Sequence, residues 1–114
     1  MNTKHTLKDR ETISRLFQKG TKIRVDPVLS LSLNNKYETV LFSVSKKNIP
    51  RAVDRNKIKR QMRAIFFNNR RLLNNVKTPK AMVFIYLEKS IIEYPKLLSC
   101  ITTILKKTKW NEKQ

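Results

Sequence analysis

The residues most able to do chemistry in this sequence are the basic ones between positions 51 and 63. Read at helical spacing, the apolar residues from Ile58 onward share one face and the basic residues share the opposite face. The basic face spans about three helical turns, roughly 18 Å, and consists of Arg51, Arg55, Lys57, Lys59, Arg60 and Arg63. Unpaired charges are costly to bury, and Glu38 and Asp54 are the only carboxylates between Tyr37 and Leu87. The face is therefore suited to bind the phosphates of a nucleic acid.

Three neighbouring features add to this face. The amide of Asn56 can both donate and accept hydrogen bonds, which suits a base edge or a 2′-hydroxyl. Lys46 and Lys47 end the strand that precedes the helix. About one of the six basic residues is expected to have a structural role, because charged groups near a core are usually paired. Arg55 is the candidate, since it projects near the apolar flank and either pairs with Asp54 or caps a backbone carbonyl.

The overall charge points to the same kind of partner. The 114 residues include 26 basic and 8 acidic ones, for a formal net charge of +18. So large a charge on a small protein lowers folding stability through self-repulsion, which makes a merely solvated basic surface the weaker interpretation. The charge predicts a polyanionic partner and binding that depends strongly on salt.

Several classes of function are disfavoured by the composition. The eight acidic residues are scattered singly and His5 stands alone, so we expect no catalytic residue and no metal site in the chain itself. Cys100 is the only cysteine, which excludes an internal disulfide and predicts a small buried side chain. Gly20 is the only glycine, which excludes glycine-rich phosphate loops. No apolar stretch reaches membrane-spanning length and the start has no signal-peptide core, so we expect a cytoplasmic protein without a membrane partner.

The elements that position the basic face follow from periodicity. A helix is expected to end at Gly20, with Asp9 as its N-cap and Ile13, Leu16 and Phe17 at amphipathic spacing. Residues 28–33 alternate between apolar and polar and predict a strand, followed by a turn and a return strand at 37–45 that completes a hairpin.

The second half of the chain reads as helix, strand and helix. The long helix is expected to bury Ile58, Met62, Ile65 and Phe66. Asn68-Asn69 and Asn74-Asn75 mark its fraying end, and Thr78-Pro79 stops it. Residues 81–87 are continuously apolar, which predicts an internal strand covered on both faces. Pro95 opens a last helix. The predicted fold class is α+β, a small two-layer sandwich with the order α-β-β-(β)-α-β-α, forming a single domain over residues 1–114 with a mobile basic tail at 1–6 and a loose end at 109–114.

One segment carries a resemblance to a known family. The string Arg55-Asn56-Lys57-Ile58-Lys59-Arg60, preceded by Ala52-Val53 and by Ser43-Val44-Ser45-Lys46-Lys47, resembles the RNR signature of the bacterial ribonuclease P protein subunit. The resemblance extends roughly from Leu7 to Lys107. It implies a fold like domain 2 of ribosomal protein S5, with a left-handed β-α-β crossover around the basic helix. Sequence pattern alone predicts the right-handed form.

The resemblance also implies a function. Such a protein assembles with a large catalytic RNA that, with its bound Mg²⁺, removes the 5′ leader of precursor tRNA, and the protein subunit is not itself catalytic. No obligate protein partner is expected. By position, the residues implied to contact RNA are Arg51, Arg55, Asn56, Lys57, Lys59, Arg60 and Arg63, bordered by Lys46 and Lys47. The alternative is a ribosomal or RNA-chaperone-type protein that uses the same helix, and DNA binding ranks third.

A second site implied by the resemblance is a cleft for the single-stranded leader, between the first helix and the sheet. Its expected residues are Phe17, Ile13, Leu31 and Phe42. Family members often carry aromatic residues where this chain has Ile13 and Leu31, and usually a glycine where it has Leu41. Because stacking on an aromatic ring is worth about 1–3 kcal/mol per base, we expect weaker leader binding here. Phe17 is either the remaining cleft aromatic or a core residue.

Overall fold

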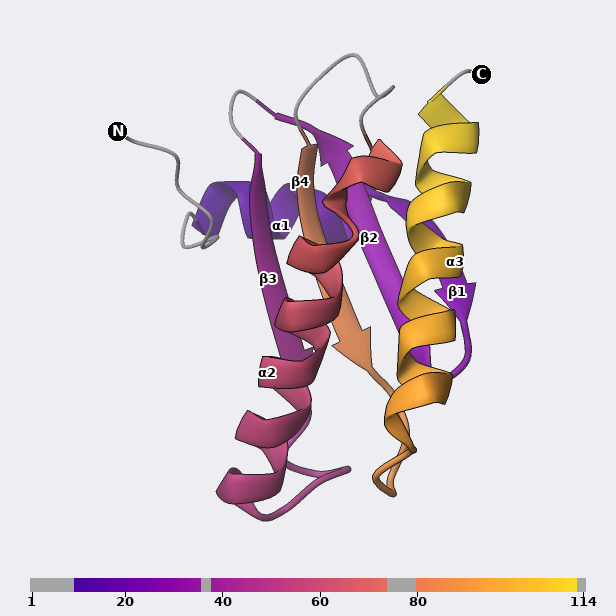
Figure 1. Ribbon diagram of the computed structural model, residues 1–114. Coiled ribbons are helices and arrows are strands. Elements are labelled where there is room, and N and C mark those ends of the chain that lie inside the picture. Colours follow the sequence, from indigo (N-terminus) through magenta and orange to yellow (C-terminus); the bar gives the residue numbers. More distant parts are fainter. Residues whose placement is uncertain (1–9, 36–37, 74–79, 113–114) are drawn as a thin grey trace, which may run out of the picture.

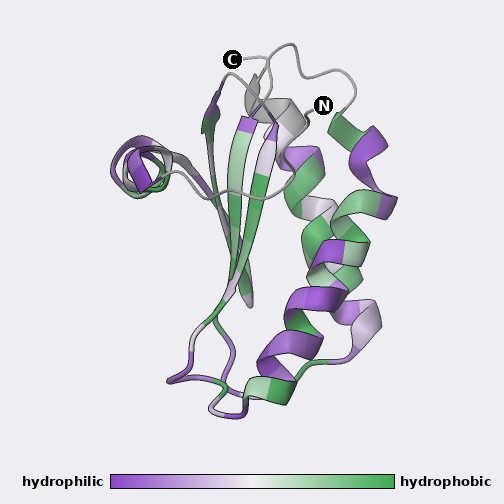
Figure 2. Cartoon of the chain, turned by 90° about the vertical axis from the view of Figure 1, so that its left-hand side faces the viewer, coloured by the Kyte–Doolittle hydropathy of each residue, from purple (hydrophilic) through white to green (hydrophobic). Residues whose placement is uncertain are grey.

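The apolar segments of the sequence form a four-stranded sheet with helices on both faces. The structure is a computed structural model that describes residues 10–35, 38–73 and 80–112. Its elements are α1 (Arg10–Lys19), β1 (Thr21–Val25), β2 (Val28–Asn34), β3 (Thr39–Val44), α2 (Ala52–Asn68), a 3₁₀ helix η1 (Arg70–Leu73), β4 (Lys80–Tyr86) and α3 (Tyr94–Glu112). Helices α2 and α3 lie side by side on one face of the sheet, and α1 runs across the other (Figures 1 and 2). The predicted α+β class and element order are confirmed.

The sheet has the order β1-β2-β4-β3. β4 pairs antiparallel with β2 and parallel with β3, so the continuously apolar strand lies inside the sheet, as expected. The predicted hairpin between the second and third strands is wrong, because each of them pairs with β4 instead. The hairpin is formed by β1 and β2, around a turn that contains the cis Asp26–Pro27 bond. The predicted order placed an additional strand after the strands at 28–33 and 37–45, whereas the additional strand β1 precedes both of them.

The connection from β3 through α2 to β4 is left-handed. β3 and β4 are parallel neighbours, and in Figure 1 both run downward with β4 to the right of β3 and α2 in front of them. With the same strands drawn upward, β4 would lie to the left of β3, which is the reverse of the usual hand. The left-handed crossover implied by the family resemblance is therefore confirmed.

Two apolar clusters hold the sheet between its helices. The larger one lies between the sheet and α2 with α3, and it includes the four predicted α2 residues Ile58, Met62, Ile65 and Phe66. The smaller one lies under α1 and joins Leu16 to Leu31, Ala81 and Val83. Because β4 contributes residues to both clusters, its side chains are apolar without interruption.

The helix ends differ in part from expectation. The amide of Gly20 donates to the carbonyl of Leu16 at 2.9 Å, and a Cβ on Gly20 would lie 2.4 Å from that oxygen, so the close turn into β1 requires glycine. The φ angle of Gly20 is not positive, in contrast to a left-handed helix cap. α3 continues to Glu112, so the expected loose end is helical up to that residue. Asp9 and the tail at 1–6 lie outside the described residues.

Candidate nucleic-acid interface

Arg55 has the structural role that its position suggested. Its Nη1 donates to the carbonyl oxygens of Ile49, at 3.0 Å, and Pro50, at 2.7 Å. Of the two alternatives, capping of backbone carbonyls is the one observed, since Asp54 lies 3.9 Å from Arg51 instead. Arg55 therefore fixes the chain that leads into α2, and its guanidinium is partly occupied before any ligand arrives.

Four residues of α2 line one groove. Asn56, Lys59, Arg60 and Arg63 are spaced i, i+3, i+4 and i+7, so their side chains form a stripe along one side of the helix. The stripe faces β3, and the groove between them has a volume of about 450 Å³. Val40, Leu41 and Phe42 line its other side. We call this the α2–β3 groove.

The charges on this stripe are not neutralised within the described residues. The two acids closest in sequence are engaged elsewhere, because Glu38 pairs with Arg70 and Asp54 lies near Arg51. No ion pair in the described part of the chain includes a cation of the stripe. The guanidinium of Arg63 lies over the ring of Phe67, 5.2 Å from its centroid, which orients the cation without cancelling its charge.

The other predicted RNA contacts surround the groove. Lys57 is exposed on α2 and Arg51 is exposed at its N-cap, and neither residue lines the groove. Lys46 and Lys47 are exposed in the turn after β3, where the backbone N–H of Lys47 donates to the hydroxyl of Ser45 at 3.0 Å. The structure thus gathers four of the nine predicted residues around one groove and places the others around it or, for Arg55, in a structural contact.

The predicted leader cleft is divided by the sheet. Leu31 is buried and Ile13 half-buried beneath α1, and Phe17 is 54% exposed on the same helix. The core interpretation of Phe17 is therefore wrong. Phe42 lies on the opposite face, in the large cluster, with its ring 5.6 Å from that of Phe84. Its expected place beside Phe17 is wrong, because Phe42 shares its strand face with Val40 and Val44.

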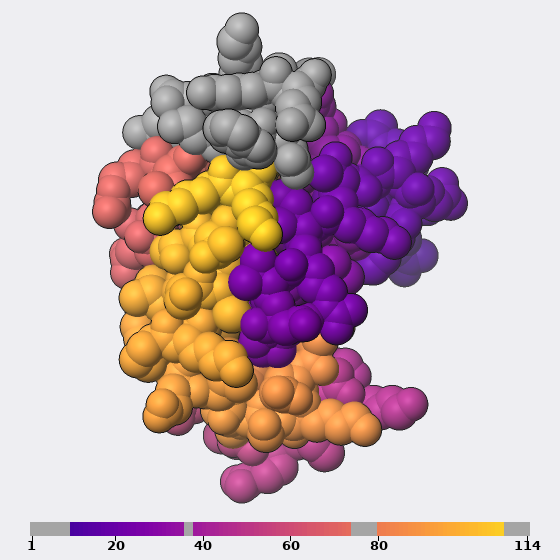
Figure 3. All heavy atoms as spheres, turned by 90° about the vertical axis from the view of Figure 1, so that its right-hand side faces the viewer, coloured from indigo at the N-terminus to yellow at the C-terminus, as the bar shows by residue number. Residues whose placement is uncertain are grey.

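The α1 face of the sheet includes residues that the pattern did not identify. Leu41 and Ile85 are half-buried and pack against the small cluster. Figure 3 shows the molecule hollowed below α1, on the side of the sheet away from α2 and α3. Alternation along β3 could have indicated Leu41 rather than Phe42, but both faces of that strand are apolar. The choice between them required knowledge of which face α1 covers.

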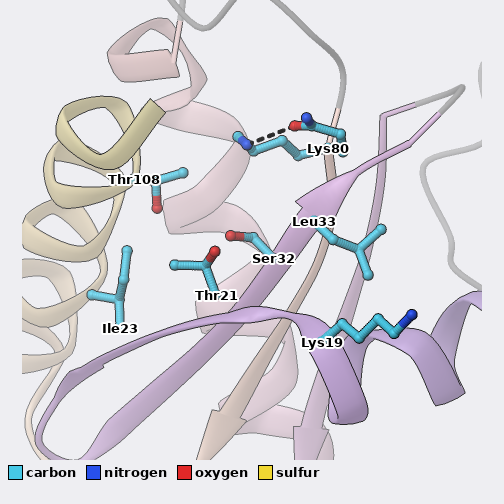
Figure 4. Close-up of a pocket in the computed structure, with 8 residues that line it drawn as sticks. Lys19, Thr21, Ile23, Ser32, Leu33, Lys80 and Thr108 are labelled. Carbon is cyan, nitrogen blue, oxygen red and sulfur yellow. Dashed lines mark hydrogen bonds between the residues drawn. The ribbon is translucent and has the colours of Figure 1, made fainter. Parts of the chain in front are cut away.

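A second pocket, of about 320 Å³, lies where α1, the sheet and α3 meet. Figure 4 shows the hydroxyls of Thr21 and Ser32 turned towards each other near Thr108, with the amine of Lys80 above them. That amine lies 3.0 Å from the Oδ1 of Asn34. Lys19, at the rim, points away from the hydroxyl groups. The sequence pattern gave no signal for this pocket.

The remaining chemical groups are structural. Cys100 is buried, as expected, and its thiol donates to the carbonyl of Asp26 at 3.1 Å. Burial raises the pKa of the Cys100 thiol, and burial likewise raises the pKa of Tyr86. Across residues 10–35, 38–73 and 80–112, no three His, Cys, Asp or Glu side chains gather closely enough to hold a metal ion. No helix in the same ranges is both long and apolar enough to cross a bilayer.

Comparisons with known proteins point in one direction. The family model described as Ribonuclease P matches residues 1–109. The ribonuclease P protein component of Chlorobaculum tepidum is 39% identical over an alignment of 83 residues, and the match covers 66% of this chain and 51% of that protein. The chain thus spans about half the length of this curated relative.

Solved structures of similar fold include RNase P proteins from two organisms. The RNase P protein of Staphylococcus aureus has a TM-score of 0.74 at 24% identity, covering 96% of this chain and 97% of that one. The RNase P protein of Thermotoga maritima has a TM-score of 0.75 at 22% identity, covering 90% and 96%. At these identities the likeness shows a shared fold.

Proposed function

Because the chain belongs to the ribonuclease P protein family, we propose that it binds the catalytic RNA of ribonuclease P together with precursor tRNA. In this role it assists the Mg²⁺-dependent removal of the 5′ leader that gives the mature 5′ end of tRNA. The protein would act in the cytoplasm as the non-catalytic subunit of an endoribonuclease ribonucleoprotein.

The observation that carries this proposal is the unneutralised stripe on α2. Lys59, Arg60 and Arg63 face an open groove without a carboxylate partner among the described residues. A fixed row of cations on a helix releases counterions when it binds phosphates, which supplies affinity for RNA. Neutralised phosphates also lower the repulsion between two RNA molecules, so the assembled enzyme should need less Mg²⁺.

The chain's part in the reaction is to bind and to orient. The described residues offer no carboxylate cluster of the kind that holds Mg²⁺, and we therefore propose that the RNA subunit holds the ion. Bound there, Mg²⁺ would supply activation of water and stabilisation of charge on the phosphate. The residues of this chain would hold the two RNAs in register.

The leader is proposed to lie on the α1 face. Phe17 exposes its ring there, on the side where the molecule is hollowed below α1. Leu41 and Ile85 are half-buried on the same face of the sheet. One exposed ring offers one stacking platform, because Ile13 and Leu31 are aliphatic. Leader binding should accordingly depend on Phe17 and on the shape of the hollow more than on several stacked bases.

The test is a cleavage assay across a range of Mg²⁺ concentrations. RNA that copurifies with the tagged protein is sequenced to identify the cognate catalytic RNA, which is then transcribed and assayed on precursor tRNA. We expect no cleavage by the protein alone and rescue of the RNA at low Mg²⁺ on adding protein. Absence of rescue, together with sedimentation of the protein with ribosomal particles, would favour the ribosomal alternative.

A further inference from the structure

We propose that the α2–β3 groove holds one unpaired nucleotide of the bound RNA, with its base inside the groove and its flanking phosphates on the cations of α2. This rests on the proposed function, since it describes how the RNA is held at the basic helix. It goes further in assigning a base, and not only phosphates, to this surface.

The shape and lining of the groove differ from those of a phosphate-binding ridge. Its volume of about 450 Å³ falls within the range of small-molecule sites, about 300–1,000 Å³. Val40 and Phe42 give it an apolar floor, and both belong to the large core, so the floor is rigid. Phosphate groups gain nothing from an apolar floor, whereas a nucleobase has two apolar faces to bury.

The wall opposite α2 supplies polar groups for a base edge. β3 is the outermost strand of the sheet, and no strand among the described residues pairs with its free edge. Backbone N–H and C=O groups of alternate residues in a strand point to opposite edges. Of the three consecutive residues that line the groove, Val40, Leu41 and Phe42, at least one therefore directs both groups to the free edge.

The side of the groove formed by α2 supplies an amide for the base and cations for the phosphates of the proposed nucleotide. The Asn56 amide, with one acceptor oxygen and two donor hydrogens, faces the same groove. Lys59, Arg60 and Arg63 continue the stripe, so that Asn56 to Arg63 covers roughly 10 Å along the helix. That length suits the phosphates on either side of one nucleotide. A base-paired nucleotide would not enter the groove. Its base is stacked inside the RNA duplex, and its Watson–Crick edge is already hydrogen-bonded to the partner base.

The rival occupant is an extended peptide that adds to the free edge of β3. An acidic peptide would also suit the cations. RNA is favoured for two reasons. The cations form a row along α2 beside the groove, where the successive phosphates of an RNA backbone can contact them, and a net charge of +18 favours a polyanionic partner.

The experiment compares two identical substitutions on the same helix. Asn56→Phe fills the groove without changing a charge, and Asn68→Phe places the same ring on an exposed position outside it. We expect Asn56→Phe to weaken binding of the catalytic RNA by about 5- to 150-fold with an unchanged salt dependence, because no phosphate contact is lost. Asn68→Phe should bind like the wild type. Thermal unfolding of both variants shows whether the fold survives, and Asn56→Ala, which only removes the amide, should weaken binding less than Asn56→Phe does.

Chemical probing of the RNA locates the base. Reagents that modify the Watson–Crick edge should find one unpaired nucleotide protected by the wild type and by Asn68→Phe, and exposed with Asn56→Phe, while the other protections remain. Equal affinities for the two Phe variants, or a flattened salt dependence in Asn56→Phe, would overturn the inference. A polyglutamate peptide serves as the probe for the rival occupant. If Asn56→Phe abolished binding of this peptide and left RNA binding unchanged, the inference would also be overturned. Failure of the wild type to rescue cleavage at low Mg²⁺ would instead overturn the proposed function.

Discussion

The guanidinium of Arg55 lies 2.7 Å from the carbonyl oxygen of Pro50, and it binds the carbonyl of Ile49 as well. α2 has no side-chain cap at its N-terminus, so this contact from within the first turn fixes the segment that enters the helix. The first residue of the basic signature thus has a structural role that Lys59 and Arg60, later in the same signature, do not share. On the single helix α2, substitution of Arg55 should therefore affect mainly the stability of the fold, and substitution of Lys59 or Arg60 should affect mainly RNA binding.

Arg55→Ala is expected to lower the free energy of unfolding by about 1–3 kcal/mol, because two backbone carbonyls lose a charged donor. Urea denaturation measures the change. Arg60→Ala is the matched control, and its unfolding free energy should stay within about 0.5 kcal/mol of the wild type, since Arg60 is exposed and forms no ion pair in the described structure. Equal stabilities for the two variants would show that the contact of Arg55 with Pro50 contributes nothing.

Arg60→Ala combined with Arg63→Ala should weaken assembly with the catalytic RNA and reduce its dependence on salt. If each cation contacts one phosphate, the slope of log K against log salt falls in magnitude by about 1.4–1.8. Filter binding at several salt concentrations measures the slope. The control is Lys106→Ala with Lys107→Ala, an exposed pair on α3 that lowers the net charge equally. An unchanged slope in the α2 variant, or the same reduction in both, would contradict a specific phosphate site on α2.

Phe17→Ala should reduce affinity for precursor tRNA with a long leader more than for mature tRNA. A lost stacking platform corresponds to about a 5- to 150-fold weaker interaction, and the fold should be unaffected because Phe17 is 54% exposed. Competition binding to the assembled enzyme measures both substrates. Gln18→Ala changes the next exposed position on α1 and should leave the ratio of the two affinities unchanged. An equal loss for both substrates would remove Phe17 from leader recognition.

Periodicity and charge predicted the parts of this structure that depend on local pattern. The buried face of α2 was identifiable because Ile58, Met62, Ile65 and Phe66 recur at helical spacing opposite a row of cations. The internal position of β4 followed in the same way from its continuous apolar run. Each of these features is decided by residues within one element.

Features that depend on which helices and strands contact each other could not be predicted from the local sequence pattern. The pairing of β3 with β4 rather than β2 follows from a long-range contact. The short β1, with two basic residues among its five, gives a weak strand signal. Phe42 was assigned to the wrong face because both faces of β3 are apolar. The left-handed crossover contradicts the general rule and was expected only from the resemblance to a family. The α2–β3 groove is lined by two elements. The pattern of α2 alone predicted the cations on one side of it, but it could not predict that Val40 and Phe42 form the apolar floor.

The burial of Cys100 gives the protein a measurable dependence on pH. Burial raises the pKa of the thiol in the folded state, so the unfolded chain releases this proton first as pH rises. The contribution to stability is therefore complete below the ordinary thiol pKa of about 8.5 and is lost as pH rises from there through the higher folded pKa. Urea denaturation of the wild type between pH 8 and 10 should show a steeper fall in unfolding free energy than that of Cys100→Ala. The two proteins differ only at position 100, so the difference between the curves isolates the thiol. Parallel curves would mean that Cys100 ionises equally well in the folded and unfolded states.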